Sequence, residues 1–269
     1  FEEGIGLLRS VERKYGVRSS WNIPIKRYRI QPKIIKGLVS EGCEIGSHGY
    51  RHDGRLIFAS ENELAERFRE SKQLLTKVSG SQVKGFRAPL LQHSRGIVHA
   101  VQKTGFLYDS SIPSWEVYSR TDGKSHGIGT VYPFMISEHL VELVVTLPQD
   151  YQLLYLGCLS PTETLKLWKT LKEYIKSLGG LCNVIIHPDE DLFGRRNMVS
   201  YYEEFIEDVA GDLECWVTLP SEVAEWWALR NRMEVTPEGR YALLPREKFG
   251  ARFDEIELIE YKPDDFVFE

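Results

Sequence analysis

The hydrophobic positions of the first residues change period from that of a helix to that of a strand. Ile5, Leu8 and Val11 recur every three residues, which places them on one face of a helix over Glu2–Tyr15. The run Val17–Ile23 then has the length and the β-branched content of a strand. The N-terminal region therefore predicts a helix followed by a strand.

The same alternation continues through residues 32–108. Ser60 and Glu63 form a capping box at the start of one helix, and Gly80 marks its end. Glycines or polar turns separate each strand-like run from the next helix. The predicted helices are Pro32–Val39, Ser60–Val78 and Ser94–Lys103, and the predicted strands are Cys43–Ser47, Val83–Phe86 and Phe106–Tyr108.

The following residues repeat the pattern less regularly. Thr130–Leu147 is rich in strand-forming residues, and Ser160 begins a strongly amphipathic helix. The run Leu181–Ile186 is largely apolar, as in a parallel strand that is covered on both faces. A helix near Tyr201–Val209 follows, and we expect one further strand and helix after it.

The pattern predicts an α/β protein with a small C-terminal addition. Repeated strand–helix units indicate either a parallel barrel or an open doubly wound sheet. After Arg232 the strand-like runs Arg240–Leu244 and Glu255–Tyr261 suggest a β appendage, so we expect domains at residues 1–232 and 233–269. In either fold, functional side chains collect at the carboxyl ends of the strands.

Composition narrows the class of protein. The 269 residues carry a net charge of −5 without a basic stripe, which makes nucleic acid a poor partner. No stretch reaches the roughly 20 apolar residues of a membrane span. The four cysteines form no CxxC pair, so we expect buried, reduced thiols and a cytoplasmic location. They are Cys43, Cys158, Cys182 and Cys215.

Two histidines follow a predicted strand in the segment EIGSHGYRH. His48 and His52 are four residues apart, a spacing that can bring two imidazoles to one metal ion. Gly49 after the first histidine excludes the HExxH pattern. For an isolated pair of this kind, one histidine capping a loop and the other lying on the surface is the commoner explanation.

Further polar residues end the other predicted strands. Arg87 and Pro89 lie in GFRAP, where an arginine can orient a carboxylate or stabilise negative charge, and Asp109 and Ser110 close the next strand. His187 ends the apolar run VIIHP, where an imidazole can act as a general acid or base. Each alone has a structural explanation, but all four groups fall at strand carboxyl ends.

In order and spacing, EIGSHGYRH, GFRAP, YDSS and IIHP resemble the motifs of the NodB-like polysaccharide deacetylases, metal-dependent carbohydrate esterases with a distorted (β/α) barrel. The resemblance spans residues 1–227. It implies a divalent metal, most often zinc, held by His48 and His52, with Arg87 holding a catalytic aspartate and His187 as the general acid. It further implies substrate contacts from Pro89, Leu90, Asp109, Ser110 and Ile185.

The sequence departs from the family pattern in ways that affect the expected activity. The family's opening motif, a strand that ends in paired aspartates, is not found; we expect it just before Phe1, and without it we expect the chain to be inactive. Gly49, Leu90 and Ile185 stand where Ser or Thr, Tyr and Leu are usual in the family.

Three functions therefore stay open. The first is removal of acetyl groups from a sugar or polysaccharide, with an N-acetylated substrate preferred over an O-acetylated one. The second is an inactive domain that binds glycans, and the third is an amidohydrolase of a small ureide or cyclic amide. An open groove lined by Trp115 and Tyr118 would favour a glycan, whereas a closed pocket would favour a small molecule.

Overall fold

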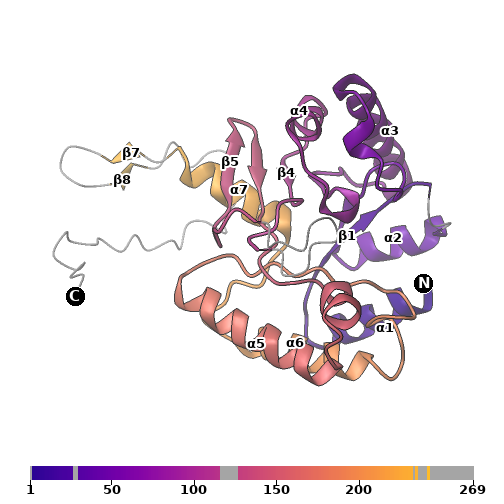
Figure 1. The fold of residues 1–269 in the computed structure, drawn as a ribbon, viewed down its shortest axis with the longest axis vertical. Coiled ribbons are helices and arrows are strands. Elements are labelled where there is room, and N and C mark those ends of the chain that lie inside the picture. The colour runs from indigo at the N-terminus through magenta and orange to yellow at the C-terminus, as the bar shows by residue number, and fades with distance from the viewer. Residues whose placement is uncertain (1, 27–29, 116–126, 233, 236–240, 243–269) are drawn as a thin grey trace.

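The protein is an α/β structure built on one mixed sheet, seen in a computed structural model (Figure 1). The structure describes residues 2–26, 30–115, 127–232, 234–235 and 241–242. The sheet order is β1-β2-β3-β4-β6-β5, and every pairing is parallel except that of β5 with β6. The strands are β1 Ser20–Ile23, β2 Glu44–Ser47, β3 Gly85–Phe86, β4 Tyr108–Asp109, β5 Phe134–Ser137 and β6 Leu140–Glu142.

Helices connect and cover these strands. Capping boxes start two of them, at Ser60 with Glu63 and at Ser160 with Glu163, and Gly80 ends the first of the two in the left-handed conformation. The α-helices are α1 Glu2–Lys14, α2 Pro32–Ser40, α3 Glu61–Ser79, α4 Arg95–Lys103, α5 Pro161–Ser177, α6 Val199–Gly211 and α7 Pro220–Arg230. Shorter turns are η1 Leu56–Phe58, η2 Pro89–Leu91 and the π-helical η3 Gln152–Leu156.

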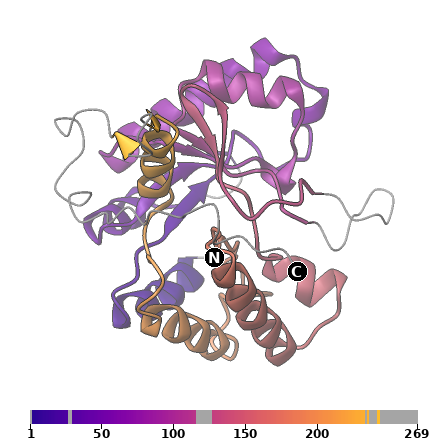
Figure 2. The same ribbon diagram turned by 90° about the vertical axis from the view of Figure 1, so that its left-hand side faces the viewer.

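The buried side chains form two main clusters that α1 joins. Ile5 packs in the first cluster with residues of α2, α3 and α4, and Leu8 and Val11 pack in the second with Trp168 of α5 and Phe205 of α6. Figures 1 and 2 show α3 and α4 at one end of the molecule and α5 and α6 at the other. Helix α1 therefore contributes apolar side chains to both clusters of the core.

One predicted strand is present only as an extended segment. Leu181–Ile186 runs beside residues 146–150, but the main-chain N–H groups of Thr146 and Leu147 both donate to the carbonyl of Asn183. The Asn183 N–H bonds the Thr146 hydroxyl instead of a carbonyl. Because the Thr146 hydroxyl takes the place of a main-chain carbonyl, the hydrogen-bond ladder between the two segments is interrupted. The prediction of a regular strand over Leu181–Ile186 was therefore wrong.

Other expectations have mixed outcomes. No strand lies between α6 and α7, although α7 itself was expected. After Arg232 the structure describes only the antiparallel pair β7 Glu234–Val235 and β8 Tyr241–Ala242, and Glu255–Tyr261 lies outside the described residues. All four cysteines are free. Cys158 and Cys182 are exposed, although we expected them to be buried. No helix in the described ranges is long and apolar enough to cross a bilayer.

Candidate active site

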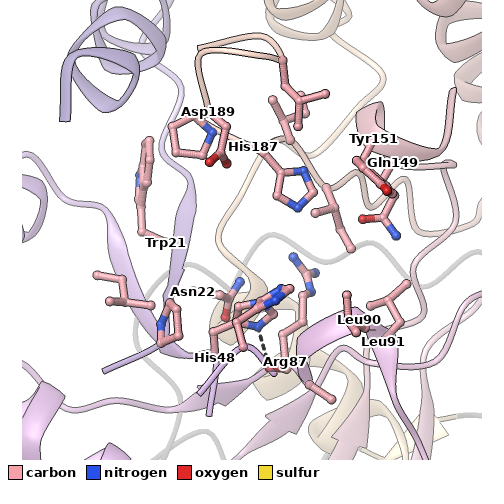
Figure 3. A pocket seen from close by; sticks show the side chains of 18 of the residues that line it. Trp21, Asn22, His48, Arg87, Leu90, Leu91, Gln149, Tyr151, His187 and Asp189 are labelled. Atoms are coloured by element: carbon pink, nitrogen blue, oxygen red, sulfur yellow. Dashed lines mark hydrogen bonds between the residues drawn. The ribbon is translucent and has the colours of Figure 1, made fainter. Parts of the chain in front are cut away.

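A cavity of about 1160 Å³ lies at the carboxyl ends of the strands. Trp21 and Asn22 of β1 line one side of it, and the segment that leads to His187 lines another. His48 and Arg87 lie across from His187 in Figure 3. Residues that are far apart in sequence meet in this cavity because they follow the carboxyl ends of neighbouring strands.

The cavity unites six of the predicted site residues. His48, His52, Arg87, Leu90, Ile185 and His187 all line it. The others do not: Pro89 is buried, and Asp109 and Ser110 are almost completely inaccessible. Because substrate cannot reach the Asp109 and Ser110 side chains, the expectation of direct substrate contact there was wrong.

The two histidines after β2 are suited to hold a divalent metal. Their ring centroids lie 5.0 Å apart. His48 Nδ1 donates to the Arg87 carbonyl over 2.8 Å, which leaves Nε2 as the lone-pair nitrogen. Burial, reinforced by His52, lowers the pKa of His48 to about 3, so its ring is neutral near pH 7, as a metal ligand must be.

These two side chains are one ligand short of a usual catalytic zinc site. Catalytic zinc is typically held by three protein ligands. Within the described ranges, no group of three His, Cys, Asp or Glu side chains is arranged to hold a metal. His48 and His52 therefore fit a metal as a partial ligand set.

Arg87 extends from the end of β3 into the cavity. Its guanidinium donates to the Ser110 carbonyl over 2.9 Å, to the Ser110 hydroxyl over 2.7 Å and to the Asn183 amide oxygen over 3.5 Å. These acceptors are neutral, and burial lowers the pKa of Arg87 from its usual value. A charged guanidinium held by neutral groups in a cavity is suited to binding an anion or a carboxylate.

His187 forms a short pair with a carboxylate that the sequence analysis missed. Its Nδ1 lies 2.6 Å from Asp150 Oδ1, and its main-chain N–H donates to Asp150 Oδ2 over 2.8 Å. Burial opposes protonation of the imidazole, but the adjacent Asp150 carboxylate outweighs it and raises the pKa of His187 above its usual value. Asp150 itself is fully buried.

Asp150 could have been found by the rule that located the histidines. It lies three residues after Leu147, where the strand-rich stretch Thr130–Leu147 ends, so it too comes shortly after a predicted strand region. Asn183 left no such signal, because its amide sits inside an apolar run. In the structure it bonds both the Ser110 hydroxyl and the Leu143 carbonyl.

The turn after Arg87 is strained. Leu90 and Leu91 have φ values of 58° and 52°, in the left-handed region that costs a leucine roughly 1 kcal/mol. The Leu90 side chain is 55% exposed and lines the cavity. Two consecutive residues held in this conformation beside functional side chains fit the usual placement of backbone strain at functional sites.

The aromatic residues expected to line an open groove do not do so where the structure describes them. Trp115 is partly buried and packs against the second core cluster, and Tyr118 lies outside the described residues. Tyr151 and Tyr155 line the cavity instead, with rings stacked at 5.4 Å and 23°. Aromatic character at the cavity therefore comes from the region of η3.

The fold and the site define an α/β protein whose histidine-lined cavity opens at the strand carboxyl ends. Residues 11–108 match the model of the polysaccharide deacetylase family. This segment contains His48, His52 and Arg87, but not Asp150 and His187. The matched segment is similar to the polysaccharide deacetylase family, whose members are also called NodB or CE4 proteins.

Two curated relatives and one solved structure illustrate the similarity. The chain is 29% identical over 113 residues to the peptidoglycan deacetylase-like protein FGM2 of Gibberella zeae and 28% identical over 111 residues to a peptidoglycan deacetylase of Helicobacter pylori. These matches cover 40% and 41% of this chain, but only 32% and 38% of the relatives.

The structural comparison extends over most of the chain. A putative polysaccharide deacetylase from Mycobacterium smegmatis superimposes with a TM-score of 0.67 at 23% identity. The similarity covers 85% of this chain and 78% of that one. It establishes that the α/β fold is that of the distorted barrels of the family.

Proposed function

We propose that this chain carries the site of a metal-dependent deacetylase that removes acetyl groups from an N-acetylated sugar or polysaccharide. The observation that carries the proposal is the convergence of His48 and His52, with Arg87 and the Asp150-paired His187, on one cavity. The match of residues 11–108 to the polysaccharide deacetylase family supports the hydrolase class. Zinc is the proposed metal because imidazole suits it.

The proposed roles follow from the geometry. His48 and His52 would hold the metal, which when bound supplies Lewis-acid polarisation of the acetamido carbonyl and a more acidic water. His187 is the proton donor to the leaving amine, because the Asp150 carboxylate raises its pKa and so favours the protonated imidazole. Asp150 orients that ring and stabilises the imidazolium.

Arg87 completes the proposed machinery. Its guanidinium would orient a catalytic carboxylate or stabilise negative charge in the cavity, and the Leu90 N–H is the candidate oxyanion donor. We propose that two carboxylates, one acting as base and one as third metal ligand, come from outside the described residues. The partial ligand set in the described chain supports this assignment.

The test is acetate release from an N-acetylglucosamine oligomer by the zinc-loaded protein, both as this chain and as its natural polypeptide. His187→Ala should abolish release, whereas His139→Ala should not, because the His139 side chain is exposed on the β5–β6 turn. The deacetylase proposal fails if zinc-loaded protein releases no acetate from N- or O-acetylated sugars.

A second candidate is a domain that binds acetylated glycans without hydrolysing them. The observation in its favour is that only two metal-binding histidines are assembled within the described ranges. Glycan binding without acetate release, in the natural polypeptide loaded with zinc, would support it. A small ureide in the same panel tests the amidohydrolase alternative.

A further inference from the structure

Two carboxyl groups lie side by side in the interior, away from the cavity lining. Asp109 on β4 and Glu142 on β6 are register partners in a parallel pair, so their side chains project from the same face of the sheet. Both residues have no accessible surface. Asp109 Oδ2 and Glu142 Oε2 are buried without a hydrogen-bond partner in the described part of the chain.

A single shared proton accounts for both unpaired oxygens. Two ionised carboxylates would repel each other in a medium that solvates neither, and each buried oxygen would lack a donor. One proton between Oδ2 and Oε2 removes both penalties. Burial raises the pKa of Asp109 to about 7, and burial with the neighbouring Asp109 raises that of Glu142, while the cation Arg87 opposes both shifts.

The other oxygens of the pair hold the chain that follows β4. Glu142 Oε1 accepts the main-chain N–H groups of Ser111 over 3.1 Å and Ile112 over 2.8 Å. Asp109 Oδ1 accepts the Ser111 hydroxyl. The pair therefore fixes both the backbone and the side chain of Ser111.

Ser111 connects this pair to the active-site turn. Its hydroxyl oxygen accepts the N–H of Ala88 over 2.8 Å. The peptide that carries this N–H also carries the Arg87 carbonyl, which accepts Nδ1–H of His48 over 2.8 Å. The same peptide leads into the strained leucines of η2. A continuous set of hydrogen bonds thus joins the carboxyl pair to a proposed metal ligand.

We propose that Asp109 and Glu142 share one proton and act, through Ser111, as positioning residues for the Arg87–Ala88 peptide and hence for the ring of His48. With one shared proton the pair carries one negative charge instead of two. Asp109 Oδ1 and Glu142 Oε1 stay available as hydrogen-bond acceptors. In the proposed deacetylase this arrangement selects the His48 tautomer that presents Nε2 to a metal. That last step rests on the proposed function.

The experiment uses two spectroscopic readouts and neither metal nor substrate. Infrared spectroscopy at pH 6 detects a buried protonated carboxyl group through its C=O band. Nitrogen-15 NMR of labelled histidines reports the tautomer of His48, assigned by comparison with His48→Gln. Glu142→Gln tests the proton, because its amide can donate to Asp109 Oδ2 and still accept from Ser111 and Ile112. Ser111→Ala tests the connection, because only the hydroxyl is removed.

The matched control is Glu44→Gln. Glu44 is another buried carboxylate, but it accepts from the Tyr108 hydroxyl and from Ser221 N–H. It is not part of the connection through Ser111. We expect Glu44→Gln to leave both the infrared band and the His48 resonances unchanged.

We expect Glu142→Gln to lose the protonated-carboxyl band and to keep the wild-type His48 tautomer. Ser111→Ala should shift the His48 ring nitrogens toward a mixture of tautomers. Absence of the band in the wild type, or its persistence in Glu142→Gln, would overturn the shared proton. Unchanged His48 resonances in Ser111→Ala would overturn the positioning role. A missing deacetylase activity would leave these readings unaffected, so the two proposals fail separately.

Discussion

At the scale of single residues, the environment shifts the pKa values of two histidines of one cavity in opposite directions. Burial and His52 keep the ring of His48 neutral, whereas Asp150 favours the charged form of His187. These shifts support the proposed roles of His48 as a metal ligand and of His187 as a proton donor. These opposite tendencies arise within a single site and are the electrostatic basis of the proposed chemistry.

Removing the negative charge next to His187 should lower its pKa. Asp150→Asn keeps a polar partner of similar size but leaves burial, which opposes protonation, without compensation. We expect the pKa of His187 to fall by at least ~1 unit. Histidine NMR titration measures it, with exposed His139 as the internal reference. An unchanged pKa would show that Asp150 does not support the imidazolium.

Metal binding should depend on both histidines that follow β2. His48→Gln and His52→Gln should each weaken zinc binding by roughly 10-fold or more, since each removes one ligand of a small set. Isothermal titration of zinc into the wild type and the two variants checks this, and His139→Gln is the control. Equal zinc affinity in all four proteins would exclude the proposed ligands.

At the scale of elements, close packing between neighbouring strands fixes the position of Arg87. A Cβ atom added to Gly85 on β3 would lie 1.9 Å from the Tyr108 ring on β4. Tyr108 is itself fully buried, and its hydroxyl bonds Glu44 on β2. Position 85 therefore requires glycine, because the Tyr108 side chain approaches the backbone there. Gly85 lies two residues before Arg87.

Gly85→Ala should disturb the sheet beneath the cavity. Because the added methyl group overlaps a buried ring, we expect a loss of about 1–3 kcal/mol in the free energy of unfolding. Chemical denaturation measures it. Gly6→Ala in α1 is a suitable comparison, because a Cβ there meets nothing within 4 Å, and it should be neutral or stabilising. Equal effects of the two substitutions would contradict this packing argument.

At the scale of the whole molecule, buried ionisable groups make stability depend on pH. The Asp109–Glu142 pair has raised pKa values in the folded state, so its contribution is most favourable at low pH and is lost as pH rises through about 7. His48 acts in the opposite sense. Its lowered pKa favours the fold above pH ~6.5, and this contribution is lost as pH falls toward about 3.

Comparison of Glu142→Gln with the wild type isolates the carboxyl pair. The variant removes one ionisable group of the pair and leaves His48 unchanged. Relative to the wild type, we expect Glu142→Gln to gain about 1–3 kcal/mol between pH 5 and pH 8. Urea unfolding across this range measures the difference, and a constant difference would refute the assignment of a raised pKa to the pair.

Much of this protein could be predicted from local sequence. The capping box at Ser60, the helix start at Ser160 and the periodic apolar positions of α1 predicted helices that the structure confirms, because these signals act over a few residues. Strand-end placement likewise located His48, Arg87 and His187. The direction of the chain and the length of each apolar run were sufficient to place these residues at the ends of predicted strands.

Tertiary structure alone decided how those residues are used. Asp109 was expected at the substrate and is instead buried against Glu142, because strand register is set by pairing between distant segments. The partnership of Asp150 with His187 depends on the approach of residues 37 positions apart. The sequence determined which chemical groups follow the strands. Packing across the sheet determined which of these groups face the cavity and which, like Asp109, are buried beneath it.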